Sequence, residues 1–381
     1  MNRPLYFDAI AATRPSRQAI LAAFSYYEEK YASPASPHTL GQEVLLDAKK
    51  GYAELYELFS ADPADHFVFT SSGAEAVSQM IYSVYQEIVK KQGKNHFVCR
   101  EIDEAPFILS CSRLEEDACK LRLAKVSSNG YITPDALIDA IGPRTALVSC
   151  QLASALTGVV QPVDEIAAIC KERGILFHLD ITHCIGKMPI SLKDLSCDFV
   201  SFNAEQFHGL RGSGGLFIKK GAPYTPLIPS APLNIALFRS LVEAVRTAKE
   251  ELMSFCTEVA QLRGMLEERL AGDCPQTHVL FQNEERLSHV SCICFPGVKS
   301  DALAFALNRK GLYASIGGEN LQHIQRVLEA CGVPKSQASC ALSFSLSKDT
   351  QEQDIERATI LVKECLERLR KTSTYYFPHE P

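Results

Sequence analysis

Leu176-Phe-His-Leu-Asp180-Ile-Thr182-His-Cys-Ile-Gly186-Lys187 is the stretch that decides the fold of this 381-residue chain. An apolar run extends from Ile175 to Leu179, and an acid, Asp180, stands where the run ends. Such a run between polar and glycine residues is typical of a strand buried in a parallel sheet. In open α/β sheets, ligands bind outside the carboxyl ends of the strands. We therefore expect Asp180 to lie where a binding or catalytic site is found.

The rest of the chain alternates predicted strands with predicted helices. A second strand is predicted over 199–202, and a long helix over 237–270. This alternation indicates an α/β fold with a mostly parallel sheet. We predict a large domain over 15–255, which holds the cleft, and a smaller α/β domain made from 1–14 and 256–381.

Composition limits the classes of partner. The net charge is −6 and no basic block is present, so neither nucleic acid nor an anionic membrane is expected to bind. No apolar run approaches the roughly 20 residues that a membrane span needs, and the first residues lack the pattern of a signal peptide. The 14 cysteines are scattered and form no C-x-x-C metal motif. We expect free thiols, a cytoplasmic protein and no metal site.

Several motifs together are similar to those of a known family. They are Asp180-Ile-Thr182, Gly186-Lys-Met-Pro189, Gly209, Gly212 and Phe344-Ser-Leu346. The chain resembles the class V aminotransferases, specifically the NifS-like cysteine desulfurases, over essentially its whole length. The resemblance implies the type I fold of pyridoxal-phosphate-dependent transferases, pyridoxal phosphate as cofactor and a homodimer.

The resemblance also assigns roles that this chain cannot fill. A lysine holds the cofactor as a Schiff base in that family, and Gln206 stands in its place. Glu104 replaces the histidine that stacks on the cofactor ring, and Glu319 replaces the cysteine that accepts sulfur. Ser343 replaces the arginine that binds the substrate carboxylate. The inherited cofactor-binding positions are Asp180, Thr182, Gly73, Ala74, Asn203, Glu205 and Gln206.

These replacements predict a chain that is inactive in the family reaction. A glutamine amide is neither nucleophilic nor basic, so covalent cofactor binding is expected to be absent. Lys187 is not expected to reach the pocket in its place. Asp180 is expected to bond to Thr182 or His183, and His183 and His208 are expected to flank the pocket.

Three functions stay open. The first is a pseudoenzyme with a binding or regulatory role. The second is an active pyridoxal-phosphate-dependent cysteine desulfurase or aminotransferase that supplies sulfur for iron–sulfur cluster assembly. The third is a new enzyme that uses Glu104, Glu205 and Glu319 as acid–base groups.

Overall fold

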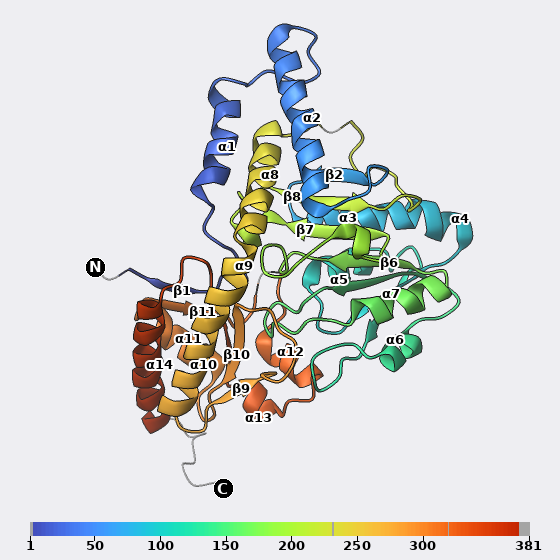
Figure 1. Ribbon diagram of the computed structural model, residues 1–381. Helices are drawn as coiled ribbons and strands as arrows, with labels where there is room; N and C mark the ends of the chain where they lie inside the picture. Colours follow the sequence, from blue (N-terminus) through green and yellow to red (C-terminus); the bar gives the residue numbers. More distant parts are fainter. Residues whose placement is uncertain (1–2, 231, 319, 373–381) are drawn as a thin grey trace.

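A computed structural model of the chain describes residues 3–230, 232–318 and 320–372 (Figure 1). Its centre is a seven-stranded mixed sheet in which β6 pairs in parallel with β5 and β7, so the predicted α/β class is confirmed. In spatial order its strands are β2 (His66–Thr70), β8 (Gly214–Ile218), β7 (Phe199–Asn203), β6 (Leu176–Asp180), β5 (Thr145–Gln151), β3 (His96–Arg100) and β4 (Lys120–Ala124).

Only β8 runs against its neighbours, pairing antiparallel with both β2 and β7. Every residue of β3, β5 and β8 is buried, as expected for a sheet that is covered on both faces.

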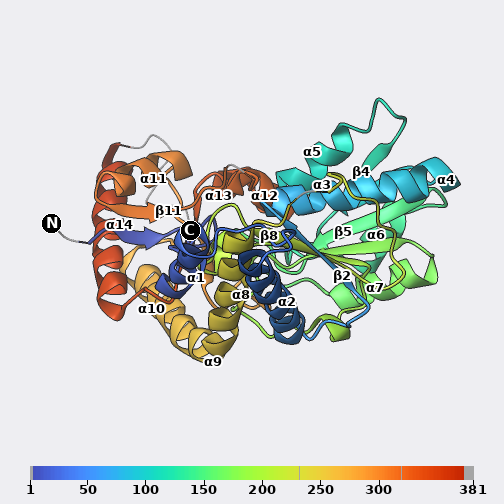
Figure 2. The same ribbon diagram turned by 90° about the horizontal axis from the view of Figure 1, so that it is seen from above.

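Helices cover both faces of this sheet (Figure 2). Successive strand residues point to opposite faces. Phe97 and Leu216 pack in one apolar cluster with α3 and α5, whereas Val98 and Phe217 pack in another with α2, α7 and α8. The helices of this part are α1 (Arg17–Glu28), α2 (Thr39–Phe59), α3 (Gly73–Val84), α4 (Lys90–Gln92), α5 (Ala105–Ser112), α6 (Pro134–Ala140), α7 (Val163–Glu172) and α8 (Ile235–Glu250).

Two smaller sheets form the other part of the molecule. One has the order β12 (Ala341–Ser345), β10 (Val290–Cys294), β9 (His278–Leu280), and the other pairs β1 (Leu5–Phe7) with β11 (Leu312–Ala314). Their helices are α9 (Leu252–Ser254), α10 (Ala260–Asp273), α11 (Ser300–Asn308), α12 (Ile324–Ala330), α13 (Lys335–Ala338) and α14 (Glu352–Thr372).

The run α8–α9–α10 connects the two parts (Figure 1). It contains a π-helical turn at Phe255–Val259, so the predicted long helix is present with an irregular centre. One apolar cluster draws all its buried members from residues 5–7 and 255–366. The predicted division into 15–255 against 1–14 and 256–381 stays a prediction.

The described part of the chain has no helix with the length and hydropathy that a membrane span requires. All 14 cysteines lie within it as free thiols, and only Cys197 and Cys256 are partly exposed.

Candidate functional site

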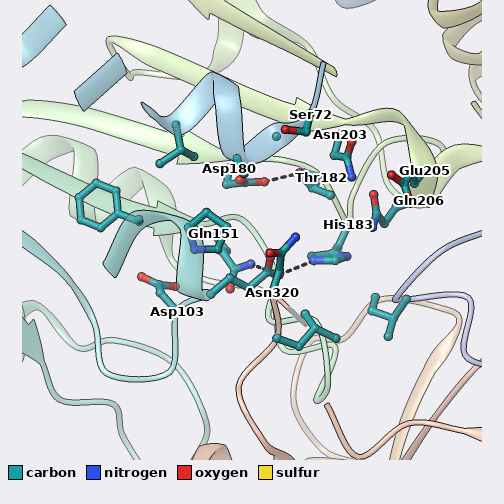
Figure 3. Close-up of a pocket in the computed structure, with 18 of the residues that line it drawn as sticks. Ser72, Asp103, Gln151, Asp180, Thr182, His183, Asn203, Glu205, Gln206 and Asn320 are labelled. Atoms are coloured by element: carbon teal, nitrogen blue, oxygen red, sulfur yellow. Dashed lines mark hydrogen bonds and ion pairs between the residues drawn. The ribbon is translucent and has the colours of Figure 1, made fainter. Parts of the chain in front are cut away.

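A cavity of about 220 Å³ opens at the carboxyl ends of β3, β5, β6 and β7 (Figure 3). This is the sheet edge at which the sequence predicts a site. The residues that line it are Ile10, Ala11, Ser72, Gly73, Ala74, Val77, Asp103, Glu104, Pro106, Phe107, Ser149, Gln151, His178, Asp180, Thr182, His183, Asn203, Glu205, Gln206, Gly318, Asn320 and Leu321.

Asp180 is the last residue of β6, and its carboxylate is held from two sides. Its Oδ1 accepts a hydrogen bond from the main-chain N–H of Thr182 at 2.8 Å, and its Oδ2 accepts one from the Ser201 hydroxyl at 2.9 Å. The expected bond to Thr182 is therefore present. Burial raises the pKa of Asp180, and the charge of Glu104 raises it further.

Gln206 lies in the short 3₁₀ turn after β7, at the wall of the cavity. Its Nε2 donates to the main-chain carbonyl of Ala11 at 2.7 Å, and its Oε1 has no partner among the described residues. Behind it, the amine of Lys187 donates to the main-chain carbonyl of Gln206. Lys187 is buried and does not line the cavity, although it lies closer to position 206 than the sequence spacing indicates.

Glu104 joins residues from three strand ends. Its Oε1 accepts from Gln151 Nε2 at 2.6 Å and lies 2.6 Å from His183 Nε2. The sequence predicts that His183 flanks the pocket and is a possible partner of Asp180. His183 does line the cavity, but the structure pairs it with Glu104 instead. The sequence does not identify Gln151, because its partner lies 47 residues away.

A buried ion pair supports this network from below. Arg100 ends β3, is wholly buried and donates through Nε to Asp103 Oδ1 at 2.9 Å. Its other nitrogens lie 3.2 Å from Gln151 Oε1 and from the Ser154 hydroxyl. The Arg100 guanidinium therefore has its hydrogen-bond partners within the protein.

His178 lines the cavity, and both of its ring nitrogens have hydrogen-bond partners. Nδ1 lies 2.8 Å from the Ser149 hydroxyl, and Nε2 lies 2.9 Å from the Ser201 hydroxyl. Burial lowers the pKa of His178 to about 3, so the ring is neutral near pH 7.

The start of α3 forms another wall. Ser72 caps the helix by accepting from the N–H of Glu75 at 3.1 Å, and the Glu75 carboxylate accepts from the N–H of Ser71 at 2.7 Å. A Cβ at Gly214 would lie 2.8 Å from the Phe202 carbonyl oxygen, so glycine is needed for this close approach. The Glu75 carboxylate thus already lies at the amino-terminal end of α3, which is the positive end of the helix dipole.

Residues 203 and 205 bring further oxygen atoms to this wall. The Asn203 Oδ1 is buried without a partner among the described residues. The Glu205 Oε2 lies 3.0 Å from Nε of Arg211, a side chain that is 76% exposed.

Not every expected position reaches the cavity. Ser343 is buried in the middle of β12 and does not line it. The expectation that His208 flanks the pocket is wrong, because its Nδ1 lies 2.8 Å from the Arg14 carbonyl oxygen and the ring is not in the wall. Glu319 lies outside the described residues. Asn320, which sequence reasoning does not single out, does line the cavity.

Among the described residues, no group of three or more His, Cys, Asp or Glu side chains could hold a metal ion.

Comparison with known proteins agrees with this architecture. The model of the aminotransferase class-V family matches residues 5–231. The chain belongs to this family. Curated relatives of similar length include a cysteine desulfurase of Bradyrhizobium diazoefficiens, 29% identical over 97% of this chain and 96% of the relative. Another is cysteine desulfurase 2 of Trichormus variabilis, 30% identical over 97% and 95%.

Solved structures show the same fold. A NifS-like protein superposes with a TM-score of 0.89 at 27% identity, covering 96% of this chain and all of the solved chain. A NifS-like protein from Rickettsia africae has a TM-score of 0.82 at 21% identity, over 97% and 100%. The expected pyridoxal-phosphate transferase fold is confirmed.

Proposed function

We propose that this class V protein does not carry out pyridoxal-phosphate chemistry and keeps the family cleft as a binding pocket. The observation that carries the proposal is Gln206, at the position that the family resemblance gives to the Schiff-base lysine. Its amide nitrogen already donates to the Ala11 carbonyl, and an amide cannot form an imine or act as a base. We find no lysine among the described residues of the wall.

The phosphate end of the cleft also argues against the cofactor. A phosphate ester would face Ala74, which has no side-chain donor, the unpartnered oxygen of Asn203 and the carboxylate of Glu205. Charge-assisted hydrogen bonds contribute roughly 1.5–3 kcal/mol each. Their replacement by acceptors and a like charge makes the residues present a poor fit for pyridoxal phosphate.

The part of the cleft where the cofactor ring would lie also argues against pyridoxal phosphate. Glu104 stands in place of a stacking ring, and it is held by Gln151 and His183. Ser343 lies outside the cavity wall and offers no cation to a substrate carboxylate. The second candidate, an active cysteine desulfurase or aminotransferase that supplies sulfur for iron–sulfur clusters, is favoured by the names of the relatives. The pocket residues favour the first.

The first test is spectroscopic. We expect the purified protein to be colourless and to show no aldimine band when pyridoxal phosphate is added. Borohydride reduction in its presence should label no lysine of the pocket, as read by peptide mass spectrometry. A saturable aldimine band, or release of sulfide from cysteine, would contradict the proposal.

The reversal Gln206→Lys is the matched control. We expect it to restore no desulfurase activity, because the positions given to the sulfur-accepting cysteine and the substrate arginine remain Glu319 and Ser343. Turnover by this single variant would mean that the rest of the site is still competent.

We also propose a cytosolic homodimer. The free, mostly buried thiols support a reducing compartment.

A further inference from the structure

We propose that the cavity binds a small organic cation, an amine or a guanidine that carries no acidic group. This inference rests on the proposed function, because a lysine-bound cofactor would fill the same space.

The first argument comes from polar atoms that lack partners. Among the described residues, three side chains of the wall have a buried atom without a hydrogen bond: Gln206 Oε1, His183 Nδ1 and Asn203 Oδ1. The Gln206 side chain belongs to a residue that is 8% exposed, and its amide points toward the interior of the cavity (Figure 3). Buried polar atoms are normally paired, so these three call for a ligand.

The two amide oxygens, Gln206 Oε1 and Asn203 Oδ1, are acceptors. The Ala11 carbonyl can only accept, which fixes the Gln206 nitrogen toward it and leaves the oxygen free. His183 is 3% exposed, and its Nε2 lies 2.6 Å from a Glu104 oxygen, so Nε2 carries the proton. The missing partner must therefore be rich in N–H donors.

The second argument is charge. The wall carries the carboxylates of Asp180, which ends β6, and of Glu104, which follows β3 on the other side of β5, and Glu205 at its rim. Within the described residues of the wall there is neither a lysine nor an arginine. Arg100, beneath the wall, is bonded to Asp103, and Arg211 pairs with Glu205 at the rim, which leaves Asp180 and Glu104 without a Lys or Arg partner among the described residues. A bound cation would offset the repulsion between Asp180 and Glu104, whereas a carboxylate or phosphate would increase it.

Size and geometry narrow the class. A volume of about 220 Å³ has room for roughly seven water molecules at about 30 Å³ each, which suits a small molecule and excludes a peptide. No metal-binding group of side chains is present among the described residues, so the cation is organic. The carboxylates and amide oxygens suit an ammonium or guanidinium group.

The test compares two ligands that differ by one carboxylate. Agmatine carries an ammonium and a guanidinium group, and L-arginine is the same molecule with an added carboxylate. Isothermal titration of the full-length wild-type protein should show agmatine binding roughly tenfold to a hundredfold more tightly than arginine. 1,4-Diaminobutane and guanidinium chloride are tested beside them. The proposal is overturned if none of the three cations binds at millimolar concentration, or if arginine binds as well as agmatine.

Variants then locate the site. Glu104→Gln and Asp180→Asn should each weaken agmatine about tenfold or more, whereas Glu165→Gln, at an exposed residue of α7, should leave the affinity unchanged. Gln206→Lys places an ammonium group in the cavity and should abolish binding. Thermal melts check that each variant folds, and the agmatine–arginine comparison needs no variant. Unchanged affinity in folded Glu104→Gln and Asp180→Asn would overturn the assignment.

The two proposals fail differently. An aldimine band in the wild-type protein contradicts the loss of pyridoxal-phosphate chemistry. A protein that stays colourless with pyridoxal phosphate and binds none of the cations contradicts only this further inference.

Discussion

Lys187 is an amine buried directly behind the glutamine that occupies the lysine position. Burial lowers the pKa of Lys187 to about 8, while its ordinary value is 10.5. Its amine donates to the Gln206 carbonyl and lies near the ring of Phe255. The residue therefore fixes the backbone of the 3₁₀ turn rather than the chemistry of the cavity.

The lowered pKa of Lys187 predicts a pH-dependent stability. Between about pH 8 and 10.5 the unfolded chain binds a proton at this residue that the folded chain has released, so stability rises with pH in that window. From pH 7 to pH 10, the free energy of unfolding of the wild type should increase by on the order of 2 kcal/mol relative to that of Lys187→Met. Urea unfolding at several pH values measures it. A difference that stays constant would show that the amine is not desolvated.

The Arg100–Asp103 pair predicts a large loss of stability when one partner is removed. Arg100→Met leaves the Asp103 carboxylate buried without its partner and should cost about 3–5 kcal/mol in urea unfolding. Arg269→Met, at an exposed pair with Glu356, should cost less than about 1 kcal/mol. The double variant Arg100→Met, Asp103→Leu should recover much of the loss. Equal effects at the two sites would contradict the role of burial.

Sequence reasoning reached some of these residues and not others. Asp180 could be placed because an acid that ends an apolar run must lie at a sheet edge, and its bond to Thr182 is local. The pairing of Glu104 with His183 and Gln151 could not be predicted, because it depends on the order of β3, β5 and β6 in space. The position of Lys187 behind Gln206 depends in the same way on the turn after β7.

At the scale of elements, β8 shows how connection length decides direction. Only the turn and loop between Asn203 and Gly214 join β7 to β8. A parallel pair needs a longer crossover, usually with a helix, so β8 must return antiparallel. The strand was predictable from its apolar run, and its direction follows from the short connection.

The helix α1 predicts the dimer. It buries Ala19, Ala23 and Tyr26 against the rest of the chain, but Ile20, Phe24 and Tyr27 form a second apolar face with exposures of 45%, 53% and 62%. We expect light scattering to give twice the 42.0 kDa of one chain. The variant Phe24→Asp, Tyr27→Asp should give a monomer.

The control for α1 is Met253→Asp, at a residue of α9 that is 73% exposed and should leave the dimer intact. A wild-type monomer at micromolar concentration would remove the proposal of a homodimer.

At the scale of the whole molecule, the fold was more predictable than the site. Apolar runs and glycine turns occur throughout the sequence and specify how the elements pack, so the α/β class can be predicted from the sequence. The site depends on which strand ends meet and on how each side chain is bonded. The unpartnered atoms Gln206 Oε1 and His183 Nδ1 are properties of the folded molecule alone.

Because the cysteines are mostly buried, their reactivity can report unfolding of this molecule. Burial raises the pKa of the Cys197 thiol to about 12 and also raises that of Cys256, so even the two partly exposed thiols are poor nucleophiles near neutral pH. A thiol reagent that releases a coloured product should therefore react slowly with the native protein. In concentrated guanidinium chloride it should react with all 14 thiols. The rate at which colour develops in native buffer would then time spontaneous opening of the core, and a ligand that fills the cavity should lengthen that time.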